Sequence, residues 1–262
     1  MCWSAEVAAG FTVGELLLAV YLWRRNWSPR DRYVLPLALS VTMIEALEVV
    51  LWLDDPVPFT SAHSATCSAR NVTATILAYL TLLLQPVLDG FFLFFTTDGG
   101  VLTKKSTKIA YWSAAIGMYL AGIGAFLHAH FAPAGSNKLD REVVLSADSL
   151  YSDSTCTFVG PNGHLLWQFS INDLLVPSTI EAGYFALSLT WLLYKPFKVG
   201  SAFFVLLNGM LAANMWYFRG SKESYSVWCW QAVAIYLFFI VEPYVLETPR
   251  ASKPKAKANK TS

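Results

Sequence analysis

Hydrophobic residues gather in seven long runs along the chain, and polar stretches separate these runs. A bilayer core about 30 Å thick needs roughly 20 apolar residues in a helix. Backbone polar groups in lipid must be satisfied within the segment, so each run predicts a membrane-spanning helix. The predicted helices cover residues 7–23, 34–53, 74–96, 109–130, 171–194, 199–217 and 226–246.

The seven predicted helices form one bundle over residues 1–247. Residues 248–262 are a basic tail without apolar periodicity, predicted to be disordered. The fold class is therefore all-α, a polytopic membrane protein with seven transmembrane helices. Composition agrees: the chain is 55% hydrophobic and 14% charged, whereas soluble domains are about 25% charged. Without a coherent basic face, nucleic-acid binding is not expected.

Lys and Arg divide unequally between the two sets of loops. One side holds nine of them in loops and five in the tail, fourteen in all, whereas the other side holds five. Because cytoplasmic loops carry the basic excess, the N-terminus is predicted outside and the C-terminus in the cytoplasm. We expect a multi-pass protein of the plasma membrane or an endomembrane, with the bilayer as its partner. A homo-oligomer is compatible with this pattern.

All four cysteines fall outside or at outer helix ends. An even number on the oxidising side indicates disulfides. Three pairings exist, of which we prefer Cys67 with Cys156, joining two outside loops, and Cys2 with Cys229. The alternative is four unpaired thiols packed as small hydrophobic side chains. Asn71 begins an Asn-x-Thr sequon in an outside loop and is a candidate for glycosylation.

Several short motifs are spread over most of the chain: Met1-Cys2-Trp3-Ser4, Glu45-Ala46-Leu47-Glu48, Gln85-Pro86, Cys156 with Gly163-His164-Leu165-Leu166-Trp167, and Trp228-Cys229-Trp230. In these motifs the chain resembles a family of uncharacterised multi-pass membrane proteins whose members begin Met-Cys-Trp-Ser or Met-Cys-Phe-Ser. The resemblance implies the same fold. It implies no activity, because none is assigned to that family.

The first three and the last three predicted helices carry similar landmarks in the same order, including Glu15 and Glu181, and Gln85-Pro86 and Glu242-Pro243. This order is typical of a parallel repeat with the fourth helix as linker, the plan of sugar-transporting SWEET proteins. Chance similarity is the alternative.

Acidic and amide side chains occur within the predicted helices, where an ionisable group is costly and usually functional. No Lys or Arg is expected at comparable depth. The carboxylates would then be protonated, share protons, face water or hold a cation. The alternative is that they only hydrogen-bond between helices. The candidates for a substrate or ion pathway are Glu45, Glu48, Gln85, Asp89, Glu181 and Glu242.

The preferred function is a transporter or channel for protons, cations or a small polar solute, acting through these carboxylates. A seven-helix receptor or sensor is the first alternative, and an intramembrane enzyme the second. An enzyme is not expected, because no nucleophile–base pair is visible. No metal or cofactor is expected, because no C-x-x-C or H-x-x-x-H spacing is present.

Overall fold

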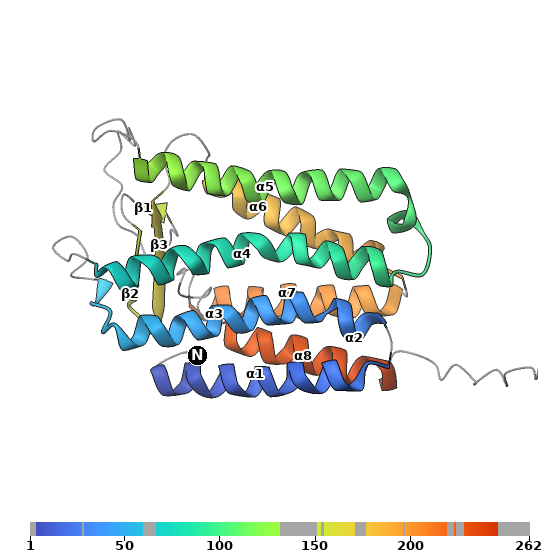
Figure 1. Ribbon diagram of the computed structural model, residues 1–262, viewed down its shortest axis with the longest axis horizontal. Helices are drawn as coiled ribbons and strands as arrows, with labels where there is room; N and C mark the ends of the chain where they lie inside the picture. Colours follow the sequence, from blue (N-terminus) through green and yellow to red (C-terminus); the bar gives the residue numbers. More distant parts are fainter. Residues whose placement is uncertain are drawn as a thin grey trace, which may run out of the picture.

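Seven long helices lie side by side, and successive helices run in opposite directions (Figure 1). They are α1 (Ala5–Arg25), α3 (Leu35–Leu53), α4 (Ala69–Thr96), α5 (Lys105–Phe131), α6 (Pro177–Ser188), α7 (Phe197–Tyr217) and α8 (Trp228–Val245). The short helix α2 (Pro29–Tyr33) precedes α3, the 3-10 turn η2 (Val101–Thr103) precedes α5, and the 3-10 turn η3 (Leu189–Leu193) continues α6. This computed structural model describes residues 4–27, 29–59, 67–131, 151–152, 155–170, 177–195, 197–218, 223 and 228–245.

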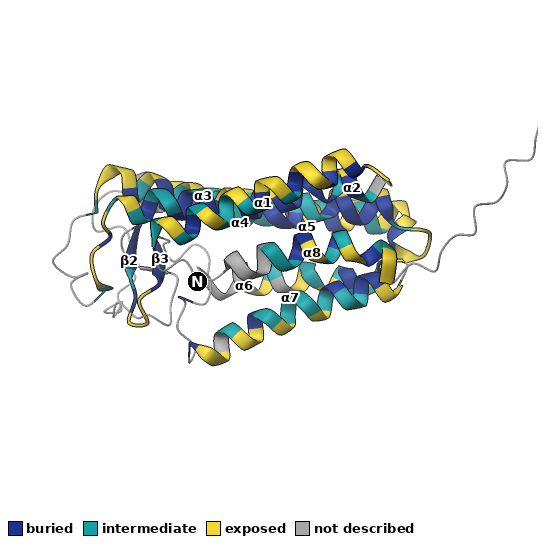
Figure 2. Ribbon diagram, turned by 90° about the horizontal axis from the view of Figure 1, so that it is seen from below, coloured by how far each residue is buried: buried dark blue, intermediate teal, exposed yellow. Residues whose placement is uncertain are grey.

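The helices close a ring in chain order. Each long helix packs against the next, with η3 making the contact between α6 and α7, and α8 returns to α1. Additional contacts join α3 to α8 and α4 to α6, so the inside of the ring is narrow. Buried residues lie on the helix sides that face one another, and exposed residues lie on the outer sides (Figure 2). The predicted internal repeat stays a prediction.

Capping residues explain where several helices begin and end. The Ser4 hydroxyl accepts a hydrogen bond from the Val7 N–H at 3.4 Å, and Asn26 ends α1 in the left-handed region with φ 37°. The Ser68 hydroxyl accepts from the Asn71 N–H at 3.0 Å. This cap starts α4 at Ala69, before the predicted start at residue 74.

The all-α prediction is wrong in one region, because the long segment before α6 contains a small sheet. Strands β1 (Tyr151–Ser152), β2 (Cys156–Val159) and β3 (Leu165–Ser170) lie in the order β1-β3-β2. β2 pairs antiparallel with β3, with Cys156 opposite Gln168, and β1 pairs parallel with β3. Of the fifth predicted helix, residues 171–194, the described part begins with α6 at Pro177.

The sheet closes one end of the helix ring, which we call the sheet end (Figure 1). On β3, Leu165, Trp167 and Phe169 are at most 1% exposed and pack with side chains of α3 and α4, including Ile44 and Tyr79. The strand is therefore part of the hydrophobic core, and the segment is more than a surface connector. A second hydrophobic cluster, with an aromatic group around Phe92, Trp191 and Phe239, fills the opposite end.

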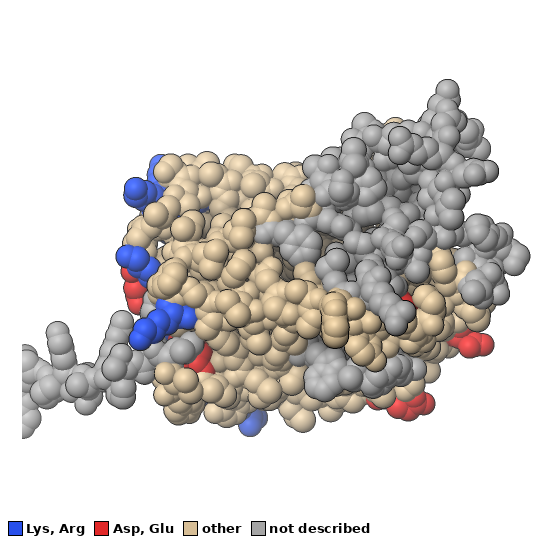
Figure 3. Space-filling model, turned by 180° about the vertical axis from the view of Figure 1, so that it is seen from behind, with Lys and Arg blue, Asp and Glu red and all other residues tan. Residues whose placement is uncertain are grey.

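That opposite end, marked by α2, is the basic end, where Lys and Arg side chains gather (Figure 3). Large apolar side chains are exposed on the outer helix faces, such as Leu17 at 65% and Val205 at 66%. Five of the described helical segments are long and apolar enough to cross a membrane, and two shorter apolar segments, Ala182–Leu193 and Val233–Val245, accompany them. The helix composition is that of a membrane protein. The tail, residues 248–262, lies outside the described residues.

Two glycines of α7 provide a test of the packing between α7 and η3. A Cβ on Gly200 would overlap the carbonyl oxygen of Trp191 and lie 2.7 Å from the Cβ of Tyr194, whereas a Cβ on Gly209 meets nothing within 4 Å. We expect Gly200→Ala to destabilise the protein by about 1–3 kcal/mol through overpacking. Gly209→Ala, the matched control, should be neutral or stabilising by up to about 1 kcal/mol. Thermal melting in detergent measures both, and equal melting of the two variants would contradict the described contact.

Candidate functional site

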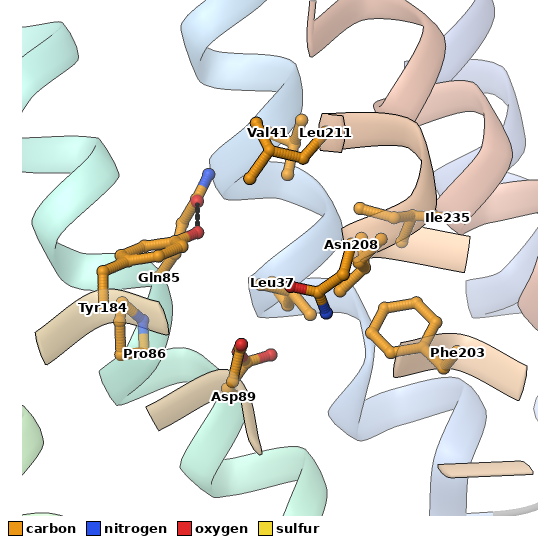
Figure 4. Close-up of a pocket in the computed structure, with 12 residues that line it drawn as sticks. Leu37, Val41, Gln85, Pro86, Asp89, Tyr184, Phe203, Asn208, Leu211 and Ile235 are labelled. Carbon is orange, nitrogen blue, oxygen red and sulfur yellow. Dashed lines mark hydrogen bonds between the residues drawn. The ribbon is translucent and has the colours of Figure 1, made fainter. Parts of the chain in front are cut away.

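A small cavity lies inside the ring, lined by α3, α4, α6, α7 and α8 (Figure 4). Its volume is about 40 Å³, enough for at least one water molecule, which occupies about 30 Å³ in the liquid. A carboxylate, two carboxamides and two hydroxyls lie among its apolar lining residues. These polar residues are Asp89, Gln85, Asn208, Tyr184 and Ser188.

Hydrogen bonds hold part of this polar lining in place. The Tyr184 hydroxyl donates to Gln85 Oε1 at 2.6 Å, and the Asn208 amide donates to the Phe204 carbonyl at 2.9 Å. Within the described part of the chain, Gln85 Nε2 and Asp89 Oδ1 are buried and have no hydrogen-bond partner. The Asp89 carboxylate points into the cavity (Figure 4). Water in the cavity would satisfy both groups, and a small cation would satisfy the Asp89 carboxylate.

Proline and glycine shape the part of α4 that presents Gln85 and Asp89. Pro86 has no N–H, so it leaves the Leu82 carbonyl without its helical donor. The Tyr111 hydroxyl of α5 donates to the Pro86 carbonyl at 2.7 Å. At Gly90, an added Cβ would lie 2.9 Å from the Tyr111 ring, so the glycine permits close packing of α5. The cavity side of α4 is therefore held from behind by α5.

A second polar group lies between α1, α3 and α8, and we call it the acidic cluster: Glu15, Glu45 and Glu48, each 0% exposed. The charges of these three carboxylates act on one another. Beside them, the hydroxyls of Thr42 and Tyr236 form a hydrogen bond of 2.9 Å. Neither carboxylate oxygen of Glu15 has a hydrogen-bond partner among the described residues.

The central cavity and the acidic cluster are separate sites. Val41 and Ile235 line the cavity, whereas the next residue of each helix, Thr42 or Tyr236, belongs to the pair beside the acidic cluster. Consecutive helical residues point about 100° apart, because a turn contains 3.6 residues. The α3–α8 contact therefore divides the interior, and the predicted pathway residues do not line one common cavity.

At the basic end, Arg25 of α1 joins three helices. It forms a buried ion pair with Asp31 of α2, in which its Nε donates to Asp31 Oδ2 at 3.0 Å. It also donates to the carbonyls of Phe239 and Ile240 in α8, at 2.8 and 2.9 Å. Pro243 removes the helical donor for the Phe239 carbonyl. Arg25 therefore supplies the hydrogen bond that the proline takes away.

Glu242 corrects the expectation that no basic side chain lies beside the predicted carboxylates. Arg30 Nη1 lies 2.8 Å from Glu242 Oε1, and the Glu242 side chain is only 1% exposed. The physical reason is that α2 packs against α1, α3 and α4, and this places Arg30 beside a residue of α8 that lies 212 positions later. Glu242 is thus paired with a cation and lies apart from the cavity.

A buried carboxylate also organises the sheet end. Glu223 is 0% exposed and accepts hydrogen bonds from the Asn162 N–H at 3.0 Å and the His164 N–H at 3.1 Å, within the β2–β3 turn. The Asn162 side-chain amide donates to it at 2.6 Å. His164 is 4% exposed, and its burial lowers the pKa of the imidazole to about 4.

The disulfide and the sequon of the sequence analysis both fall at the sheet end. Cys67 and Cys156 form a disulfide, the pair preferred from sequence. Asn71 is only 3% exposed, donates to the Thr157 carbonyl at 2.9 Å and accepts from the Thr157 N–H at 2.8 Å. A glycan on this buried amide would have to be accommodated beside Thr157, and glycosylation of Asn71 stays a prediction. The side chain of Cys229, and all of Cys2, lie outside the described residues.

The structure thus assigns the predicted pathway residues to three places. Gln85 and Asp89 line the cavity, Glu45 and Glu48 belong to the acidic cluster, and Glu242 lies in the ion pair. The side chain of Glu181 lies outside the described residues. In the described part of the chain, no three His, Cys, Asp or Glu side chains come together in a way that could hold a metal ion.

Sequence reasoning missed Glu15 as a site residue, although a signal was present. Glu15 lies in the middle of an apolar helix, the same property that selected Glu45. Tyr184 and Asn208 carried no comparable signal, because hydroxyl and amide groups occur in membrane helices without a functional role.

A ring of apolar helices with a hydrophobic core and a few buried polar groups has the composition of a helical membrane protein. The chain belongs to a family of unknown function (DUF5765), whose family model matches residues 8–247. It is similar to "Uncharacterized protein R287" of Acanthamoeba polyphaga mimivirus, with 27% identity over 170 residues that cover 64% of this chain and 65% of that protein. No solved structure matches the chain. This match is consistent with the resemblance to a family of uncharacterised membrane proteins that the sequence motifs indicated. It assigns no activity to the chain.

The Arg25 contacts predict a large loss of stability when the Arg25 side chain is removed. Arg25→Ala leaves Asp31 buried without its cation and two α8 carbonyls without their donor, and breaking a buried pair costs about 3–5 kcal/mol. The neighbouring Arg24 is exposed, so Arg24→Ala should change stability by less than about 0.5 kcal/mol. Denaturant titration in detergent measures both variants. Similar unfolding midpoints would show that the Arg25 contacts do not stabilise the bundle.

His164 predicts a dependence of stability on pH. Its pKa in the folded protein is about 4, below the ordinary value of about 6.5 expected in the unfolded chain. As pH falls from about 6.5 to 4, the unfolded chain binds this proton before the folded protein does, so stability decreases. The melting temperature should therefore fall less steeply over this range in His164→Gln than in wild type. His128→Gln, at an exposed position, should keep the wild-type slope.

Proposed function

We propose that all seven helices cross the bilayer with the basic end in the cytoplasm, and that the protein moves protons or a monatomic cation through the central cavity. The observation that carries this proposal is the buried, unpaired Oδ1 of Asp89 beside Gln85, Tyr184 and Asn208 in the middle of the ring. Burying a carboxylate inside a membrane protein is energetically costly, and such a residue usually marks a functional site.

The size of the cavity favours a very small substrate. About 40 Å³ accommodates water or a single ion and is too small for an organic solute. We therefore narrow the transport hypothesis to protons and monatomic cations. Asp89 would bind the transported ion, and the amide and hydroxyl groups around it would replace part of the ion's hydration.

The two ends of the ring fit a transporter in a closed state. The buried sheet covers the outer mouth, and the Arg25–Asp31 and Arg30–Glu242 pairs hold α1, α2 and α8 together at the inner end. Each closure is made of discrete contacts that a conformational change could open and reform.

The test is ion flux into liposomes that contain the purified protein and a trapped pH-sensitive dye. With a membrane potential imposed by potassium and valinomycin, wild-type liposomes should acidify faster than empty ones, or show a sodium or potassium flux in the matching assay. Asp89→Asn should lower the flux roughly tenfold or more, because it removes the titratable group from the path.

Asp98→Asn is the matched control, because Asp98 follows the same helix and is exposed at the basic end. It should keep wild-type flux. If wild-type liposomes conduct protons, sodium and potassium no faster than empty liposomes, or if Asp89→Asn conducts normally, the proposal is wrong.

A further inference from the structure

Outside the cavity, a buried carboxylate, Glu15, lies in the middle of α1. This carboxylate is 0% exposed, and neither of its oxygens has a hydrogen-bond partner within the described residues. Its helix packs against α3 and α8, so Glu15 faces the protein interior. An unpaired anion at such a position would cost several kcal/mol. The geometry therefore requires a ligand that neutralises the charge.

The groups around Glu15 identify the kind of ligand. Glu45 and Glu48 on α3 interact electrostatically with Glu15, and so does Tyr236 on α8. The Tyr236 hydroxyl is hydrogen-bonded to Thr42 of α3. No Lys or Arg belongs to the central part of α1, α3 or α8, so no basic side chain of these helices neutralises Glu15.

A metal cation is not supported, because no metal-binding group of three side chains is found in the described residues. A proton requires only one oxygen, and nearby carboxylates favour its binding by repelling one another's charge. The hydrogen-bonded hydroxyls of Thr42 and Tyr236, 2.9 Å apart, can accept from or donate to a neighbouring carboxyl group.

We propose that Glu15, together with Glu45, is a proton-binding site at the contact of α1, α3 and α8, separate from the central cavity. Binding forms one O–H bond on a Glu15 oxygen and removes one negative charge from the acidic cluster. Release returns the proton to water and restores the carboxylate. The inference rests on the proposed function only in naming the proton as an ion that the transporter uses; the binding itself does not depend on transport.

Infrared spectroscopy of the purified full-length protein in detergent tests the site directly. A protonated carboxyl group has a carbonyl-stretch band that a carboxylate lacks, and titration with alkali should remove it. In Glu15→Gln, the part of this band that titrates in wild type at neutral to alkaline pH should be reduced. Glu6→Gln, at an exposed position of the same helix, should leave the band unchanged.

A second variant keeps the test independent of misfolding. Tyr236→Phe retains the carboxylates and the ring but removes the hydroxyl that bonds Thr42. It should shift the band position or its titration midpoint, since both depend on local hydrogen bonding. A wild-type spectrum without a titrating carboxyl band, or a band unchanged in both Glu15→Gln and Tyr236→Phe, would overturn the proposal.

The same samples in liposomes separate this inference from the proposed transport. If the band depends on Glu15 but wild-type liposomes conduct no ions, the proton site stands and the transport function fails. If wild type conducts and Asp89→Asn does not, while the infrared band is insensitive to Glu15, transport stands and the Glu15 site fails.

Discussion

The arrangement of the ring depends on how Arg25 is satisfied. Its guanidinium neutralises Asp31 and donates to the carbonyls of Phe239 and Ile240, so one side chain connects α1, α2 and α8. Unsatisfied backbone groups are costly inside a membrane protein, and Pro243 creates one in α8. The hydrogen bond from Arg25 to the Phe239 carbonyl satisfies this group and also holds α1 against α8. Because the planar guanidinium presents several donors in a fixed fork, lysine could not make all these bonds at once.

Closing the ring at the basic end determines what lies inside it. With α8 held against α1 and α3, Tyr236 reaches Thr42, and the acidic cluster lies on one side of that contact. On the other side, α4, α6 and α7 surround the small cavity with Asp89. Polar residues of similar depth are thereby divided between two sites.

Much of the fold was predictable from hydrophobic pattern, since apolar runs of about 20 residues have few alternatives to a membrane helix. Each of the seven predicted helices has a counterpart among the described helices, and α4 begins earlier than predicted because the Ser68 cap starts it at Ala69. The strands were not predictable in the same way, because β3 is buried on both faces and its short apolar run lacks alternation. Sidedness predicted disulfides, with Cys67–Cys156 as the preferred one of the possible pairs, whereas the burial of Asn71 depended on its pairing with Thr157.

The sequence by itself determined which segments are helices, where the charges lie along the chain and which polar residues fall in mid-helix. These properties depend on local composition and on spacing within one segment. Only the tertiary structure decided that Arg30 meets Glu242, that Glu15 joins Glu45 and Glu48, and that Gln85 and Asp89 share a cavity with Tyr184 and Asn208. Such contacts join residues far apart in the chain, and the rotation of each helix about its axis sets them. Packing against neighbours fixes that rotation, and a uniformly apolar segment carries little information about it.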